Sequence, residues 1–141
     1  MNTSKLFVVD DDLFSLNQYQ QGFKNLGFED VELFENGTQC LNNLHKKPAV
    51  VFLDHNMEDL NGFEVLKKIK RYDPNIFVVI VSAQEDMKTA IDSLKFGAFD
   101  YVIKNGTEIN RMKEVLERIK QIQEELKQSN PGFLRKLLSI F

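Results

Sequence analysis

The sequence has 141 residues, the length of a single domain with a full hydrophobic core. Hydrophobic residues make up 43% and charged residues 28%, close to globular averages, which excludes a wholly disordered chain. A net charge of −3 with scattered lysines and arginines disfavours direct nucleic-acid binding, and a single cysteine, Cys40, excludes an internal disulfide and a cysteine-based zinc site. The polar N-terminus and the lack of an apolar run of about 18 residues lead us to expect a cytoplasmic protein without membrane contact.

Short apolar runs alternate with segments of helical periodicity along the chain. Runs rich in Val, Ile and Phe predict strands at residues 5–9, 31–34, 49–53, 76–81 and 101–103. Apolar residues at spacings of three and four predict a helix after each run. Their positions are Leu13, Leu16, Tyr19, Phe23 and Leu26, then Cys40, Leu41 and Leu44, then Phe63, Leu66 and Ile69, then Met87, Ala90, Ile91 and Leu94, and finally Ile109, Met112, Leu116, Ile119, Ile122 and Leu126.

Local signals mark where several of these helices begin and end. Gly27 and Gly97 are expected just past the first and fourth helices, and Pro74 past the third. Thr107 is expected as the N-cap of the fifth helix, with Glu108 in its first turn.

Five strands alternating with five helices predict an α/β fold with right-handed crossovers. The count fits a flavodoxin-like, doubly wound five-stranded parallel sheet of order 2-1-3-4-5. The second strand alternates polar and apolar residues, as an edge strand can. In such sheets function lies outside the carboxyl ends of the strands, so the residues that follow each strand are the first candidates for a site.

Polar side chains follow four of the five predicted strands. Asp10, Asp11 and Asp12 follow the first, Asp54 the third, Ser82 the fourth and Lys104 the fifth. Clustered carboxylates raise one another's pKa or recruit a cation, and an all-oxygen ligand set favours Mg²⁺. A carboxylate beside the ion can then form an aspartyl-phosphate, with Lys104 and the Ser82 hydroxyl facing the phosphoryl oxygens. Asp12 alone is equally well explained as a helix N-cap.

Four segments in this order resemble the receiver domain of two-component response regulators. They are LFVVDDD at 6–12, FLDHNM at 52–57 with Gly62 downstream, VSA at 81–83 and GAFDYVIK at 97–104. The resemblance covers residues 4–127, and the motifs are specific as a set although each is weak alone. We therefore expect a receiver domain over residues 1–128, followed by a tail or linker at 129–141.

The resemblance implies a role for each matching residue. Asp54 would accept the phosphoryl group, and Mg²⁺ would be held by Asp10, Asp11, Asp54 and the backbone carbonyl of Asn56. The phosphoryl group would be contacted by Lys104, Ser82 and Ala83. Ser82 and Tyr101 would change conformation on phosphorylation, and Asn56 and Gln84 would tune dephosphorylation.

The same resemblance implies the partners. The phosphoryl donor would be a sensor histidine kinase or a phosphotransfer protein, and a downstream effector protein would read the phosphorylated state. The chain would act as a phosphorelay regulator rather than an enzyme, apart from slow self-dephosphorylation. A homodimer could form through the fourth helix–fifth strand–fifth helix face or through the tail.

Two positions depart from the family pattern. Glu58 stands where a proline usually follows Met57, and Asn105 stands where a proline usually follows Lys104. A non-proline cis bond costs about 3 kcal/mol, so we expect a trans Lys104–Asn105 bond and a rearranged loop. Glu58 adds a negative charge beside the acceptor loop.

The tail combines a chain breaker with an amphipathic pattern. Asn130-Pro131-Gly132 is followed by apolar residues at helical spacing: Phe133, Leu134, Leu137, Leu138 and Phe141. A linker to an output domain, a docking or dimerisation segment and a membrane-surface segment are the alternatives, and docking or dimerisation is favoured because the segment is short.

Two other functions remain open from the residues. A Mg²⁺-dependent phosphatase of the haloacid dehalogenase type would use Asp10 and Asp12, although the later acidic pair of that family is missing. A pseudo-receiver would be an interaction module without phosphorylation, for which Glu58 and Asn105 are the only support. A flavin or nucleotide binder is disfavoured, since no glycine-rich phosphate loop follows the first strand.

Overall fold

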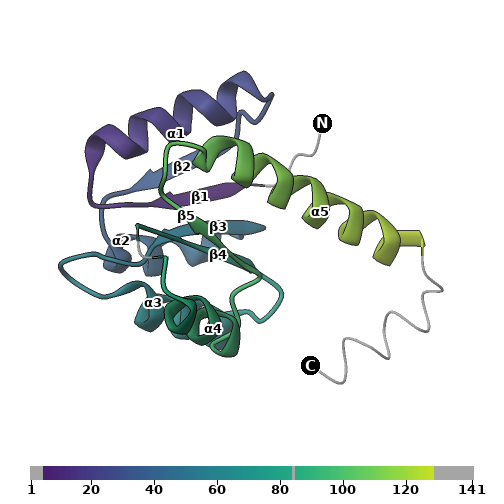
Figure 1. Ribbon diagram of the computed structural model, residues 1–141. Helices are drawn as coiled ribbons and strands as arrows, with labels where there is room; N and C mark the ends of the chain where they lie inside the picture. Colours follow the sequence, from purple (N-terminus) through teal and green to yellow (C-terminus); the bar gives the residue numbers. More distant parts are fainter. Residues whose placement is uncertain (1–4, 84, 129–141) are drawn as a thin grey trace.

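A computed structural model describes residues 5–83 and 85–128 and shows a parallel sheet between two layers of helices (Figure 1). The strand order is β2-β1-β3-β4-β5, so the predicted fold class and order are confirmed. The strands are β1 (Leu6–Val9), β2 (Val31–Phe34), β3 (Val50–Asp54), β4 (Phe77–Ser82) and β5 (Asp100–Ile103). The helices are α1 (Leu13–Asn25), α2 (Gly37–Leu41), α3 (Gly62–Tyr72), α4 (Met87–Lys95) and α5 (Glu108–Gln128).

Two apolar cores lie on opposite faces of the sheet. Helices α1 and α5 cover one face and α2, α3 and α4 the other (Figure 1). Phe23 and Phe52 stack in the first core with ring centroids 5.3 Å apart, and Phe7 meets Phe34 edge-on at 4.7 Å in the second. Every residue of β1 and β3 is buried, whereas only Phe34 of β2 is, as predicted for an edge strand.

The helices end where the sequence predicts. Gly27 and Gly97 adopt left-handed φ angles of 92° and 106° just past α1 and α4, and α3 ends at Tyr72, before Pro74. Thr107 precedes the first residue of α5, and its carbonyl accepts the amide of Arg111 at 3.1 Å. Its hydroxyl donates to Asn105 Oδ1 at 2.6 Å.

The second helix differs from the prediction. It spans Gly37–Leu41, and Leu44 begins a separate 3₁₀ turn that ends at Lys46. The helix starts early because Asn36 accepts the amide of Gln39 at 2.8 Å, and because the Asp59 carboxylate accepts the Thr38 amide and hydroxyl at 3.1 and 3.0 Å. Asp59 lies in the β3–α3 loop, a contact that periodicity within residues 37–44 does not reveal.

None of the helices in the described part of the chain is long and apolar enough to cross a membrane.

Candidate functional site

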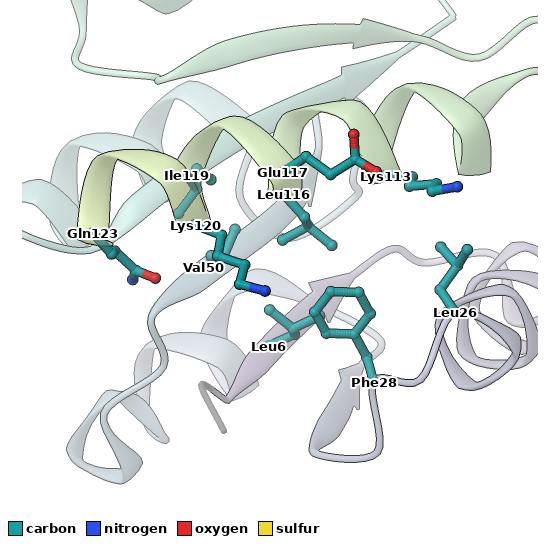
Figure 2. A pocket seen from close by; sticks show the side chains of 10 residues that line it. All are labelled: Leu6, Leu26, Phe28, Val50, Lys113, Leu116, Glu117, Ile119, Lys120 and Gln123. Atoms are coloured by element: carbon teal, nitrogen blue, oxygen red, sulfur yellow. The ribbon is translucent and has the colours of Figure 1, made fainter. Parts of the chain in front are cut away.

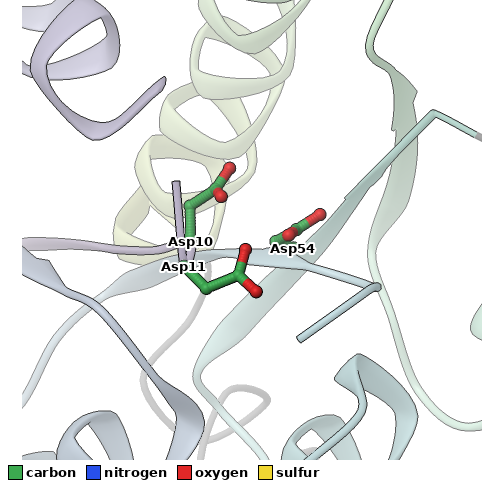
Figure 3. A group of neighbouring side chains, drawn as sticks. All are labelled: Asp10, Asp11 and Asp54. Carbon is green, nitrogen blue, oxygen red and sulfur yellow. The ribbon is translucent and has the colours of Figure 1, made fainter. Parts of the chain in front are cut away.

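Three carboxylates meet at the edge formed by the carboxyl ends of β1 and β3 (Figure 3). Asp10, Asp11 and Asp54 each place one oxygen within 4.8 Å of the others. Asp10 is 1% exposed and Asp54 5%, whereas Asp11 faces solvent. The amide of Asp12 donates to Asp10 Oδ1 at 2.9 Å, which fixes the Asp10 side chain. The predicted acidic cluster is therefore built from two strand ends 44 residues apart along the chain.

Lys104 brings a positive charge into this cluster from the end of β5. Its ammonium nitrogen lies 2.7 Å from Asp10 Oδ2 and 3.4 Å from Asp54 Oδ1. The backbone supports this placement, because the Lys104 amide donates to the Ser82 carbonyl at 2.8 Å, beside β4. The described residues contain no cis peptide bond, so the Lys104–Asn105 bond is trans, as expected, and Lys104 still reaches the acids.

Burial and crowding set the titration of the cluster. Burial, followed by the charge of Asp10, raises the pKa of Asp54 to about 6, and Lys104 only partly opposes this. Desolvation by burial, followed by the charge of Asp10, also raises the pKa of Asp11. The charge of Glu58 adds to this rise. The pKa of Lys104 is raised by its carboxylate partners in spite of desolvation. Three acids and one lysine leave excess negative charge, which favours a bound cation.

The donor set fits a hard divalent ion. Mg²⁺ takes oxygen ligands at about 2.0–2.1 Å, so opposite ligands of an octahedral ion lie about 4.2 Å apart. Neighbouring ligands of such an ion lie about 3 Å apart, so side-chain adjustments would bring the three oxygens, now within 4.8 Å of one another, into its shell. Asp11 and Asn56 both line an open depression of about 310 Å³ beside the cluster, together with Glu58. This depression leaves room for the waters that Mg²⁺ retains.

Asp12 does not belong to the cluster. Its carboxylate caps α1, accepting the Phe14 amide at 3.1 Å and the Ser15 hydroxyl at 2.9 Å. Hydrogen bonds from Ser15 and Phe14 accordingly lower the pKa of Asp12. The sequence left two roles open for Asp12, a metal ligand or a helix cap, and the structure shows the cap. A haloacid dehalogenase site would need Asp12 as its second acid, and this acid is not in the cluster.

The other predicted site residues lie around the same edge. Ser82 is fully buried at the end of β4, and Ala83 follows it at the surface. Tyr101 is half-buried on β5 and packs against the core under α3. Asn56 is exposed, and Gln84 falls outside the described residues.

The acceptor strand runs into a loop held close to α3. The amide of Gly62 donates to the His55 carbonyl at 2.9 Å, and a Cβ at position 62 would lie 2.7 Å from His55 Cα and 2.9 Å from the Asp54 carbonyl oxygen. Glycine at this position therefore allows α3 to start directly against the acceptor strand. The His55 ring packs on Phe63 of α3, with centroids 4.3 Å apart.

A second loop contact was not predicted from the sequence. The Glu108 carboxylate accepts the Gly106 amide at 2.5 Å and the Tyr19 hydroxyl at 3.5 Å. Asn105 Oδ1 accepts the Thr107 amide at 3.1 Å, which adds a local turn. These bonds shape the loop between Lys104 and α5 that has no proline here. Tyr19 and Glu108 are 89 positions apart, so neither residue signals the contact by its local pattern.

Comparison with known proteins agrees with this site and fold. The sequence model of the response regulator receiver domain matches residues 6–117. The chain belongs to this family, the receiver domains of two-component signalling. Among its relatives, chemotaxis protein CheY of Listeria monocytogenes is 33% identical over 115 residues, which cover 81% of this chain and 96% of CheY.

Two further relatives extend the comparison. The transcriptional regulatory protein ZraR of Klebsiella oxytoca is 38% identical over 100 residues, 70% of this chain but only 22% of the length of ZraR. The BeF3-activated receiver domain of DrrB from Thermotoga maritima superposes with a TM-score of 0.76 at 28% identity, covering 85% of this chain and 99% of that domain. Receiver domains are signalling regulators, and this chain carries the acidic cluster typical of their phosphoacceptor site.

Proposed function

We propose that this receiver domain, residues 1–128, is a phosphorylation-controlled switch in which Asp54 accepts a phosphoryl group. The donor is a phosphohistidine on a sensor histidine kinase or phosphotransfer protein, a role that places the chain in the cytoplasm. An Asp54 oxygen attacks phosphorus, the P–N bond breaks, and its electron pair stays on the donor imidazole. The observation that carries the proposal is the Asp54 carboxylate 3.4 Å from Lys104 Nζ in a cluster with Asp10 and Asp11.

Mg²⁺ completes the proposed site. Asp10, Asp11, Asp54 and the backbone carbonyl of Asn56 would hold it, and when bound it would neutralise charge on the transferred group. Lys104, Ser82 and Ala83 contact the phosphoryl oxygens, since a developing anion is stabilised by fixed cations and donors. Asn56 and Gln84 tune the later loss of the group to water, because an amide positions water but is a poor general base.

Ser82 and Tyr101 then change conformation and alter the surface that an effector protein recognises. This surface is the face of α4, β5 and α5. Helix α4 supports its assignment, because Met87 is 76% exposed and Ile91 and Leu94 are also exposed, leaving apolar side chains available to a partner or to a second copy. Phosphorylation would shift an existing equilibrium between two conformations of this face.

The test is the intact mass of the protein after incubation with Mg²⁺ and acetyl phosphate. We expect a gain of one phosphoryl group that is labile in acid and in base, requires Mg²⁺ and is absent in Asp54→Asn. Asp59→Asn is the matched control, because Asp59 lies five residues away and binds α2 rather than the cluster.

Three results would overturn the proposal. Uptake of phosphate by Asp54→Asn would move the acceptor elsewhere. Absence of both uptake and Mg²⁺ binding near neutral pH would identify a pseudo-receiver in which Glu58 and Asn105 accompany a silent site. Sustained turnover of small phosphomonoesters would instead favour a phosphatase.

A further inference from the structure

An apolar groove opens between α5 and the start of the sheet, at the end of β1 and β3 opposite the aspartates. Figure 2 shows Leu116 and Lys120 of α5 on the side of the helix toward Leu6, Val50 and Phe28. The groove has a volume of about 250 Å³. Its apolar lining is Leu6, Leu26, Phe28, Val50, Leu116 and Ile119.

The shape and chemistry of the groove indicate the kind of group that fits it. Its volume lies below the roughly 300–1,000 Å³ of small-molecule pockets. The lining is mainly aliphatic and aromatic, and its charged groups, such as Glu117 and Lys120, come from α5. A cavity of this size and polarity suits a few apolar side chains of a protein segment better than a polar ligand.

Two segments of the sequence adjoin the described elements that line this groove. Residues 1–4 precede Leu6 closely but contain a single apolar residue, Met1. Residues 129–141 follow α5, which forms one wall, and they contain five apolar residues at helical spacing. On a helical projection these five residues, Phe133, Leu134, Leu137, Leu138 and Phe141, occupy one stripe about 140° wide. Ser139 lies opposite its centre.

Chain length permits this segment to reach the groove. The groove-lining residues of α5 run from Lys113 to Gln123, about 15 Å along the helix, and residues 133–141 would make a helix about 13 Å long. To pack beside α5, the second helix must start about 8–10 Å from the α5 axis and about 7 Å before Gln128 along that axis. The chain from Gln128 to residue 133 must therefore span about 12 Å. Five residue steps, from 128 to 133, span up to about 17 Å. Pro131-Gly132 supplies the turn.

We propose that residues 133–141 pack as an amphipathic helix into the groove lined by Leu6, Phe28, Val50 and Leu116 of their own chain. Leu6, Val50 and Leu116 are already buried, so the contact would bury the apolar stripe of the segment mainly against the half-buried Leu26 and Phe28, at the end of the α1–α5 face remote from Asp54. It leaves the acidic cluster open. Docking of this segment does not depend on phosphorylation of Asp54, so either of the two proposals can fail without the other.

A spin label on the full chain provides the test. Cys40 is fully buried and burial raises its pKa to about 12, so Ser139→Cys introduces the one readily labelled thiol, on the face opposite the apolar stripe. We expect the label to remove most of the methyl NMR signal of Leu6, Val50, Leu116 and Ile119 while sparing Ile91 on α4. The loss should be independent of protein concentration. Adding Leu137→Asp to the labelled chain should restore the signals, whereas adding Lys136→Asp, a charge change off the stripe, should not.

Several outcomes would overturn the proposal. Undiminished groove methyl signals in the labelled chain would exclude docking. Signal loss in isotopically enriched chains that lack the label, on mixing with labelled chains that are not enriched, would identify a second copy as the occupant. Signal loss at Ile91 instead of the groove would place the segment on the α4 face. An intact groove spectrum together with retention of the chain, but not of Leu137→Asp, on anionic phosphatidylglycerol vesicles would identify a membrane-surface segment.

Discussion

The ammonium nitrogen of Lys104 lies 2.7 Å from Oδ2 of Asp10, across 94 positions of sequence. Asp10 is almost fully buried. Among the described residues, Lys104 is the basic side chain that pairs with it. This pair joins the ends of β1 and β5, which are not neighbours in the sheet.

Replacing Lys104 should therefore destabilise the metal-free protein. In Lys104→Met the Asp10 and Asp54 carboxylates lose their counter-charge, and breaking a buried ion pair leaves an uncompensated charge. We expect a loss of about 2–4 kcal/mol in the free energy of unfolding, measured with urea in EDTA. Lys88→Met is the control, because the Lys88–Asp92 pair is exposed and should change stability by less than about 1 kcal/mol. Equal losses in the two variants would contradict this account.

The pH dependence of stability should carry the signature of Asp54. Its pKa rises from an ordinary 3.8 to about 6 on folding, so between these values the folded state binds more protons than the unfolded state. Stability contributed by this group therefore falls as pH rises from about 4 to about 6. Asp54→Asn should be more stable than the parent by about 1–3 kcal/mol at pH 7 in EDTA, with the difference vanishing near pH 4. Urea unfolding of both proteins between pH 4 and pH 7 measures this difference in stability. A difference that does not change with pH would contradict the prediction.

Gly62→Ala should damage the acceptor loop. The new Cβ would press on the backbone at His55 and Asp54, which cannot move without displacing β3. We expect a loss of at least about 2 kcal/mol in unfolding free energy, together with slower phosphorylation by acetyl phosphate. Gly22→Ala is the matched control. The three atoms nearest its Cβ all belong to the Ile109 side chain rather than to backbone, and alanine favours helix, so its cost should be smaller than that of Gly62→Ala.

Glu108→Ala should act on the Lys104 loop rather than on stability. It releases the Gly106 amide and the Tyr19 hydroxyl from the carboxylate that holds them. We expect phosphorylation by acetyl phosphate to slow several-fold while unfolding free energy changes by less than about 1 kcal/mol. Glu114→Ala, which removes an exposed partner of Arg111 on the same helix, should leave the rate unchanged. An unaltered rate in Glu108→Ala would show that the loop holds Lys104 without this contact.

The elements of the fold were predictable because their signals are local. Apolar runs marked the five strands to within one residue at either end, and Gly27, Pro74 and Gly97 marked the ends of helices. The second helix was placed too late because its start depends on Asp59, a partner from another loop. Asp12 stayed ambiguous because an aspartate at that position suits both a helix cap and a metal ligand.

The sequence by itself determined the strands, the helices and the set of groups that follow the strands, since periodicity and strand-end residues are written within short windows. The sheet order was predicted from the count and alternation of these elements, which fit a doubly wound fold. Only the tertiary structure decided how those groups act on one another. The Lys104–Asp10 contact, the Tyr19–Glu108 contact and the close approach of Gly62 to Asp54 each depend on where strands and helices finally pack. Burial, which raises the pKa of Asp54 to about 6, likewise exists only once the core has formed around it.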